Sequence, residues 1–253
     1  MSRGHGSRPD VTIVSPHFDD APLSLGQSLL DGALAGCRVR VEVVFGRTNW
    51  TRWVHPTRGR APAISRWRRG EEAVAQAHFG YRVRSQRWEE SILRTGELDA
   101  DVFRDAAAPV EADPLVPAVA GRLRRVRGGG GLVLFPAGLG NHVDHRIVAA
   151  AGVLLAGEHD DHLAFYEDRP YVSFLEPGER DEQLRRLGPE LEPVDVSGPV
   201  TESLHRWLRR CYPSQIDDLF VDAMARDRST GARERLWFPV GRVPAWLRKV
   251  TDG

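Results

Sequence analysis

Short apolar runs alternate with amphipathic stretches along this chain. The run from Val11 to Val14 is mostly β-branched and ends at Ser15-Pro16, which is typical of a buried parallel strand that reaches the edge of its sheet. Residues 22–35 then carry leucine at helical spacing, with Pro22 in a first-turn position. The predicted elements, in order, are strand 11–14, helix 22–35, strand 38–45, helix 64–79, helix 113–127, strand 132–135, helix 145–157 and strand 163–166.

Strands that alternate with helices in this way indicate βαβ units. We therefore expect an α/β fold, with a Rossmann-like, doubly wound, mostly parallel sheet and helices on both faces. The stretch 175–202 is rich in Pro, Gly and charge, and we expect a surface excursion there, followed by a helix at 203–212. The length of 253 residues predicts a single domain, 1–253, with a C-terminal elaboration from about residue 175.

Charge and composition exclude several classes of protein. Lys+Arg and Asp+Glu both number 35, which does not fit the basic surface that nucleic-acid binding demands. Residues 50–69 are basic and aromatic, but with balanced net charge a loop that covers substrate explains them better than a single-strand platform. Cys37 and Cys211 form no metal-spaced pair, so we expect two reduced thiols. No run approaches about 18 apolar residues and no apolar leader precedes the first strand, which predicts a cytoplasmic protein without membrane contact.

The first candidate site follows the first predicted strand directly. His17, Asp19 and Asp20 supply one imidazole and two carboxylates within four residues. The carboxyl ends of strands are where ligands bind in a parallel α/β sheet, so this position favours a site. The alternative is that Asp19 or Asp20 caps the following helix while His17 is an ordinary loop residue.

The second candidate site follows the strand predicted at 132–135. It is the sequence His142-Val143-Asp144-His145, reached through a loop whose glycines allow a tightly turned path. His142 and His145 are three residues apart, so both can face the same side at the start of a helix. Taken alone, such a histidine pair also suits a surface or capping position.

The predicted topology brings the two clusters together. In a doubly wound sheet of order 3-2-1-4-5, strands 1 and 4 are neighbours at the switch point, so both clusters open on one crevice. Two imidazoles and one carboxylate form a ligand set that catalytic Zn2+ uses with one open position. The same trio also holds Fe(II), so the residues favour zinc without excluding iron.

Both clusters resemble known signatures. PHFDD followed by APLSLG resembles the PHxDD signature of the PIG-L / LmbE-like zinc-dependent N-deacetylases, and PAGLGNHVDH resembles the HxDH signature of that family. Weaker similarities, which suggest the branch acting on sugars of bacterial natural products and glycoconjugates, lie at Arg69-Gly70-Glu71-Glu72, at Tyr166-Glu167-Asp168-Arg169-Pro170-Tyr171 and at Tyr212-Pro213-Ser214-Gln215.

The resemblance implies a role for each residue of the two clusters. It makes His17, Asp20 and His145 the metal ligands and Asp19 the general base for the attacking water. It also implies that His142 stabilises the oxyanion or protonates the leaving amine. Asp144 would then orient a neighbouring imidazole, which fixes the tautomer of that ring and its basicity.

The chain departs from the family pattern at two positions. Ala21 stands where the common PHPDDE form has Glu. Gly140 stands where some relatives have a tyrosine two residues before the first His of HxDH, so the oxyanion role of that tyrosine does not transfer, and Tyr212 or Tyr166 is expected to substitute for it. Further substrate contacts are expected from Arg47, Asn49 and Trp50, which follow the second strand at the same rim; the alternative is an ordinary surface loop.

These residues together predict an amidohydrolase of the N-acetyl sugar deacetylase type. Its expected substrate is a small molecule that carries an N-acetylated or N-acylated amino sugar of the N-acetylglucosamine type, in a secondary metabolite, such as an antibiotic, or in a glycoconjugate. One alternative is hydrolysis of another amide, such as a mycothiol-type conjugate or a longer N-acyl chain. The rival from another class is a carbohydrate-binding protein without turnover, although binding alone would not require Asp19 beside the ligands. The sequence leaves the oligomeric state open.

Overall fold

The computed structural model describes residues 8–96, 104–106, 109–125, 131–156, 163–188 and 190–251. Its seven strands form one sheet of order β3-β2-β1-β4-β5-β7-β6, which is parallel from β3 to β5 and antiparallel at β7 and β6. The α/β fold and the order 3-2-1-4-5 expected from the sequence are therefore confirmed. The strands are β1 (Asp10–Ser15), β2 (Arg38–Val43), β3 (Arg82–Ser85), β4 (Leu132–Pro136), β5 (Leu163–Tyr166), β6 (Leu191–Pro199) and β7 (Arg233–Pro239).

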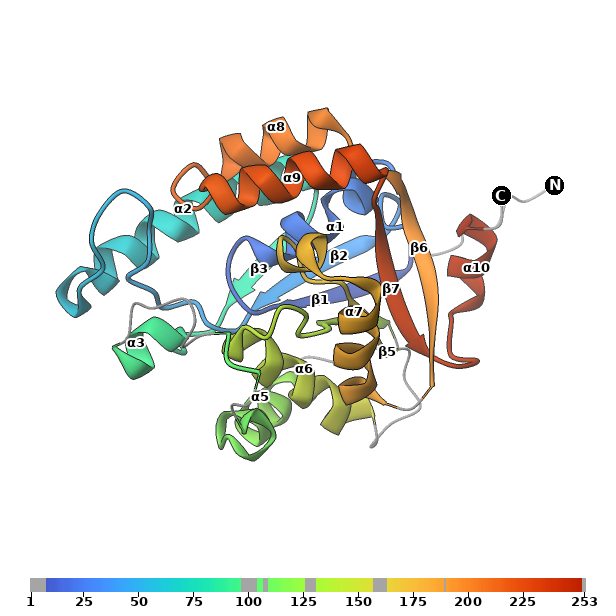
Figure 1. Cartoon of the computed structure of the whole chain (residues 1–253), viewed down its shortest axis with the longest axis horizontal. Coiled ribbons are helices and arrows are strands. Elements are labelled where there is room, and N and C mark those ends of the chain that lie inside the picture. The colour runs from blue at the N-terminus through green and yellow to red at the C-terminus, as the bar shows by residue number, and fades with distance from the viewer. Residues whose placement is uncertain are drawn as a thin grey trace.

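Helices cover both faces of this sheet, with α1, α2, α8 and α9 on one side and α5 and α6 on the other (Figure 1). The α-helices are α1 (Asp20–Leu30), α2 (Ala61–Phe79), α3 (Ser91–Thr95), α5 (Leu115–Arg124), α6 (Val143–Ala156), α7 (Pro177–Leu184), α8 (Glu202–Cys211), α9 (Asp218–Thr230) and α10 (Ala245–Thr251). Short 3₁₀ helices are η1 (Arg58–Arg60), η2 (Val110–Ala112), η3 (Tyr171–Phe174) and η4 (Arg185–Leu187). No helix in the described ranges is long and apolar enough to cross a membrane.

The core consists of two apolar layers that meet at the sheet. Successive residues of β4 alternate between them: Leu132 and Leu134 pack under α1, α2 and α8, while Val133 and Phe135 pack under α5 and α6. This two-sided burial explains why the strand is continuously apolar in sequence. Cys37 and Cys211 are both free, as expected.

The segment predicted as a surface excursion, 175–202, contains structure that the sequence interpretation missed. It forms α7 and then β6, which pairs with β7 at the edge of the same sheet. The prolines Pro193 and Pro199 are compatible with a strand here because an edge strand has one side without ladder partners, and the register shifts between Asp195 and Pro199. The Pro and Gly content that argued against a strand therefore marks an edge strand.

Most element boundaries shift by a few residues from their predicted positions. Helix α2 ends where predicted, because Gly80 adopts the left-handed conformation (φ 76°) and its N–H bonds the carbonyl of Gln76. The strand β3, from Arg82 to Ser85, was not predicted because only one of its four residues, Val83, is aliphatic. The ends of two predicted helices, residues 126–127 and 157, lie outside the described residues.

Candidate metal centre

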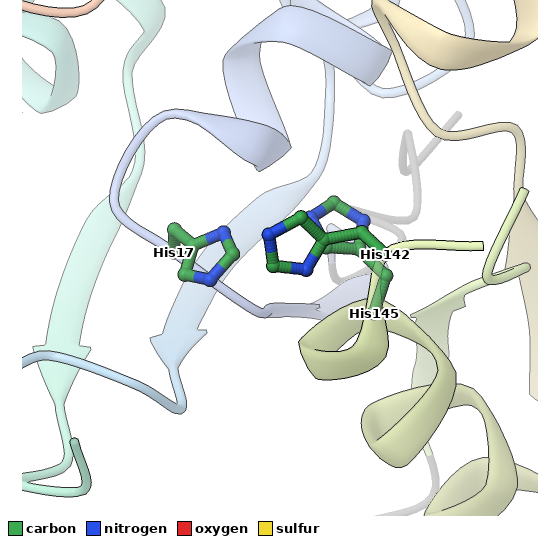
Figure 2. Close-up of side chains that lie close together, drawn as sticks. All are labelled: His17, His142 and His145. Carbon is green, nitrogen blue, oxygen red and sulfur yellow. The ribbon is translucent and has the colours of Figure 1, made fainter. Parts of the chain in front are cut away.

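Two neighbouring strands bring the predicted clusters to one place. Ile13 of β1 pairs with Leu134 of β4, so the loops that leave these strands begin side by side. Figure 2 shows the result: His17, on the loop after β1, faces His142 and His145 at the start of α6. One nitrogen from each of the three rings lies within 4.8 Å of the others, and the ring centroids are 5.1 to 5.2 Å apart.

His17 is held between two carboxylates. Its Nε2 donates to Oδ2 of Asp144 at 3.0 Å, while its Nδ1 lies 3.2 Å from Oδ2 of Asp20. Asp144 is completely buried and is itself fixed by the N–H of Ser91 at 2.9 Å and by Arg94 at 2.7 Å. Asp144 thus orients the His17 ring so that Nδ1 faces Asp20.

His145 is arranged in the same way by a different carboxylate. Its Nδ1 donates to Oδ1 of Asp168 at 2.6 Å, and its Nε2 lies 3.4 Å from Oδ1 of Asp20. Asp168 follows β5 and also accepts the N–H of Leu139 at 3.0 Å. Among the described residues, Nε2 of His145 is buried without a hydrogen-bond partner. The two oxygens of Asp20 are therefore each faced by one imidazole nitrogen.

This geometry fits a divalent cation. Because His17 and His145 donate their ring protons to Asp144 and Asp168, the neutral rings present lone pairs toward the Asp20 carboxylate. Lone pairs and a carboxylate repel one another in a buried site unless a proton or a metal ion lies among them. Two imidazoles and a carboxylate match a zinc site, and a carboxylate behind each histidine is the usual support of such ligands.

Without a metal ion, protons on the His145 and His17 rings relieve this repulsion. Burial lowers the pKa of His145, but the charge of Asp20 and the hydrogen bond to Asp168 outweigh it and raise that pKa to about 9. Burial also opposes ionisation of His17, and Asp20 and Glu90 nevertheless raise its pKa well above 6.5. A metal ion bound at this site would replace these protons, because a ligating imidazole is neutral.

His142 differs from the other two histidines in its hydrogen bonding. Its Nδ1 accepts the backbone N–H of Asp144 at 3.2 Å, so the proton of the neutral ring is on Nε2. Burial, together with the nearby His145 and His17, lowers the pKa of His142 to about 3, which favours this neutral form. A nitrogen that carries a proton is a hydrogen-bond donor and not a metal ligand, so this tautomer suits a catalytic role better than a third imidazole ligand.

Asp19 lies beside Asp20 and does not cap helix α1. It occupies the N-cap position of α1, yet its side chain makes no capping hydrogen bond. Its Oδ1 instead accepts from Arg68 of α2 at 2.9 Å, and both side chains are almost completely buried. The capping alternative therefore does not explain Asp19, and the buried guanidinium of Arg68 holds its carboxylate beside Asp20.

The metal centre opens into a cavity of about 210 Å³. One part of its wall is polar and another is apolar, and Trp50, Leu219 and Phe220 form much of the apolar part. Trp50 and Leu219 are 39% and 37% exposed, so their side chains remain available to a bound molecule. The residues lining the cavity are His17, Asp19, Asp20, Trp50, Arg68, Glu90, Ser91, Ile92, Arg104, His142, Pro170, Tyr171, Gln215, Asp217, Leu219 and Phe220.

Of the three expected substrate contacts after β2, only Trp50 lines this cavity. Arg47 forms an ion pair with Glu89 at 3.0 Å, outside the cavity wall. Asn49 is 4% exposed and lies beneath the surface, so it does not reach the bound molecule. Neither Arg47 nor Asn49 lines this cavity, so the structure gives no support to these two contacts, which stay predictions.

The structure also gives no support to the substrate contacts expected of Tyr166 and Tyr212. Both rings are completely buried. The Tyr166 hydroxyl donates to the carbonyl of Val14 at 2.9 Å, and the Tyr212 hydroxyl contacts the carbonyl of Phe18 at 3.2 Å and Glu72 at 2.6 Å. These tyrosines support the loop between β1 and α1 from inside, which leaves no hydroxyl for substrate.

Sequence reasoning assigned no role to three residues of the site, which are Asp168, Tyr171 and Arg68. Asp168 and Tyr171 lie in the segment after β5, and the rule that ligands bind at the carboxyl ends of strands, applied to that strand, identifies this segment. Tyr171 begins η3 and lies beside His142 and His145; burial and the charges of Asp20 and Asp19 raise its pKa. Arg68 carries no comparable signal, because it is one of several arginines on a predicted helix.

Comparison with known proteins found a relative of this chain. No family model matches the sequence. A 2'-N-acetylparomamine deacetylase from Streptomyces fradiae is 31% identical over 239 residues, which cover 90% of this chain and 81% of that protein.

Solved structures show the same fold. A deacetylase of the teicoplanin biosynthesis pathway superposes with a TM-score of 0.63 at 24% identity and covers 90% of this chain and 96% of its own. The A40926 pseudoaglycone deacetylase gives a TM-score of 0.60 at 21% identity and covers 94% of this chain and 100% of its own. At these identities the likeness concerns the fold.

Proposed function

The chain belongs to the PIG-L / LmbE-like N-deacetylases, and from this premise we propose that it hydrolyses the N-acetyl or N-acyl amide of an amino sugar with the help of zinc. The observation that carries the proposal is the Asp20 carboxylate, which is faced on both sides by the ring nitrogens of His17 and His145, with Asp19 beside it in the same cavity. We assign His17, Asp20 and His145 as the ligands of that zinc.

Amide hydrolysis needs an activated water, a polarised carbonyl and a proton for the leaving amine. Zinc, when bound, supplies a water of lowered pKa and polarises the carbonyl. Asp19 takes the proton of the attacking water, because its carboxylate lines the same cavity as Asp20 and Arg68 holds its Oδ1 in place. Asp144 and Asp168 hold the two ligand rings in place.

His142 is the remaining catalytic group, and it also lines the cavity. Because its Nδ1 accepts the N–H of Asp144, it presents Nε2 as the ring atom that donates a proton or a hydrogen bond. Nε2 of the neutral ring therefore donates a hydrogen bond to the oxygen of the tetrahedral intermediate, whereas delivery of a proton to the amine nitrogen would need the imidazolium form. In either role, His142 is required for turnover and not for zinc binding.

The substrate class follows from the relatives and from the cavity. The Streptomyces fradiae relative is named for deacetylation of an N-acetylated aminoglycoside, 2'-N-acetylparomamine, and two proteins of the same fold deacetylate in glycopeptide antibiotic pathways. The apolar wall of Trp50, Leu219 and Phe220 suits an amino sugar that carries a further group, as antibiotics and glycoconjugates do. We therefore propose a secondary metabolite or glycoconjugate as substrate, and the cytoplasmic location expected from the sequence stays a prediction.

Acetate release tests the proposal. Purified protein, loaded with zinc, is incubated with N-acetylglucosamine glycosides, 2'-N-acetylparomamine, an N-acyl glycopeptide pseudoaglycone and a mycothiol-type conjugate, and free amine and acetate are measured. Release from an N-acetyl amino sugar supports the proposal. Release from the mycothiol-type conjugate alone supports the other amide hydrolase, whereas binding of a sugar without turnover supports the carbohydrate-binding rival.

A further inference from the structure

Tyr171 occupies the space above a glycine next to the metal centre. Gly140 has a φ of 79°, and a Cβ atom added there would come within 2.2 Å of Cβ and 2.6 Å of Cγ of Tyr171. No side chain fits at position 140 while Tyr171 keeps this position. The absence of a side chain at Gly140 is therefore what admits the Tyr171 ring.

The Tyr171 ring lies against two histidines of the site. Its centroid is 5.5 Å from that of His145, with the rings nearly perpendicular at 84°, and 6.1 Å from that of His142. The same short segment supplies Asp168, whose carbonyl accepts the N–H of Val172 at 2.9 Å. Because Asp168 also fixes the His145 ring, the positions of the phenol and of that ligand are set by one piece of backbone.

The proposed ligands and Asp19 offer the cavity no hydrogen-bond donor of their own. Asp19 and Asp20 are carboxylates, and the ring protons of His17 and His145 point away from the cavity toward Asp144 and Asp168. Tyr171 lines this cavity, and in the part of the chain that the structure describes no protein group hydrogen-bonds its hydroxyl. A phenol is protonated at neutral pH, since its ordinary pKa is about 10, so this hydroxyl is available as a donor.

We infer that Tyr171 is a catalytic residue whose hydroxyl donates a hydrogen bond to the oxyanion of the tetrahedral intermediate; this rests on the proposed function. The water oxygen bonds to the carbonyl carbon, its proton passes to Asp19, and the C=O electron pair becomes the negative charge on oxygen. Tyr171 stabilises that charge and keeps its proton. The C–N bond then breaks, its electron pair stays on nitrogen and takes the proton that Asp19 accepted, and the products are the free amine and acetic acid, which ionises to acetate.

The test compares zinc-loaded wild type with Tyr171→Phe, which keeps the ring over Gly140 and removes only the hydroxyl. We expect kcat to fall about 10²-fold, the cost of removing one oxyanion donor, while KM and the bound zinc stay unchanged. The matched control is Tyr81→Phe, which removes a buried hydroxyl that donates to Glu72 outside the cavity and leaves kcat within about twofold.

A second measurement does not depend on turnover. Titration calorimetry gives the affinity for a tetrahedral methylphosphonamidate of glucosamine and for glucosamine itself. In Tyr171→Phe the phosphonamidate affinity falls by a factor similar to that of kcat, while the glucosamine affinity is kept. Unchanged kcat and phosphonamidate affinity in the variant would overturn this inference alone. A wild type that neither releases acetate nor binds the phosphonamidate would overturn the proposed function with it.

Discussion

The Oδ1 atom of Asp168 lies 2.6 Å from Nδ1 of His145, and both side chains are buried. This contact joins the segment after β5 to the start of α6. It fixes the tautomer of His145, because a ring nitrogen that donates to a carboxylate carries the proton and leaves Nε2 with a lone pair. The carboxylate thus decides which atom of His145 faces Asp20.

We expect Asp168→Asn to weaken zinc binding about 10- to 100-fold, because the amide no longer fixes the tautomer or adds negative charge behind the ring. The measurement is competition with a fluorescent zinc chelator. Asp195→Asn is the matched control, since Asp195 of β6 pairs with Arg235 of β7 and does not line the cavity. Equal zinc affinity in wild type and Asp168→Asn would remove Asp168 from the metal centre.

Single alanine variants separate the two possible ligand sets. We expect His17→Ala, Asp20→Ala and His145→Ala to lose stoichiometric zinc, whereas His142→Ala retains it because the His142 Nε2 carries a proton. Metal analysis after gel filtration measures the zinc content. Loss of zinc in His142→Ala, with retention in Asp20→Ala, would instead indicate a site of three imidazoles.

Asp19→Asn tests the proton acceptor. The amide is nearly the same size as the carboxylate, so we expect full zinc occupancy, while kcat falls about 10²- to 10⁴-fold because the general base is lost. The variant also loses the ion pair with Arg68, so its melting temperature is measured alongside. A folded, zinc-loaded Asp19→Asn with wild-type kcat would show that another group takes the proton.

Trp50→Ala probes the apolar wall of the cavity. For a glycoside with an aryl group we expect KM to rise about three- to tenfold, since an aromatic contact contributes about 0.5–1.5 kcal/mol, with little change for the methyl glycoside. Trp67→Ala is the control, because Trp67 is 53% exposed and lies outside the cavity lining. If KM for both glycosides is unaltered in Trp50→Ala, Trp50 does not bind substrate.

His205 gives the fold a defined dependence on pH. Burial and the charge of Arg228, which donates to Nδ1 at 2.8 Å, lower the pKa of His205 to about 4, below its ordinary value of about 6.5. Between these values the unfolded chain binds a proton that the folded chain does not. The stabilisation is therefore complete above pH 6.5 and is lost as the pH falls toward 4.

In His205→Gln, which keeps a neutral acceptor for Arg228, we expect the melting temperature to fall less between pH 7 and pH 4.5 than in wild type. Thermal unfolding followed by circular dichroism measures both proteins across this range. The nearby Asp227 and Glu202 stay in place in both, so their contribution cancels. Identical pH dependence in the two proteins would show that His205 titrates normally.

The meeting of His17, Asp20 and His145 at one site could be predicted from the sequence because it depends on local order and sheet topology. His17 and Asp20 directly follow one buried strand, and His145 closely follows another. Once βαβ order makes those strands neighbours, the clusters meet at one end of the sheet. Apolar periodicity is sufficient for this, since it identifies the buried strands and the helices between them.

Contacts between distant segments could not be predicted in this way. Arg68 reaches Asp19 from α2, and Tyr171 fills the space over Gly140, because side-chain packing in three dimensions sets both distances. Packing also places Tyr166 and Tyr212 in the core, where their hydroxyls donate hydrogen bonds to backbone carbonyls. The sequence by itself determined the order of the strands β3-β2-β1-β4-β5 and the meeting of the two clusters, through periodicity and short spacing. Only the tertiary structure decided which groups surround the ligands, because those contacts depend on the volume and direction of side chains far apart in the chain.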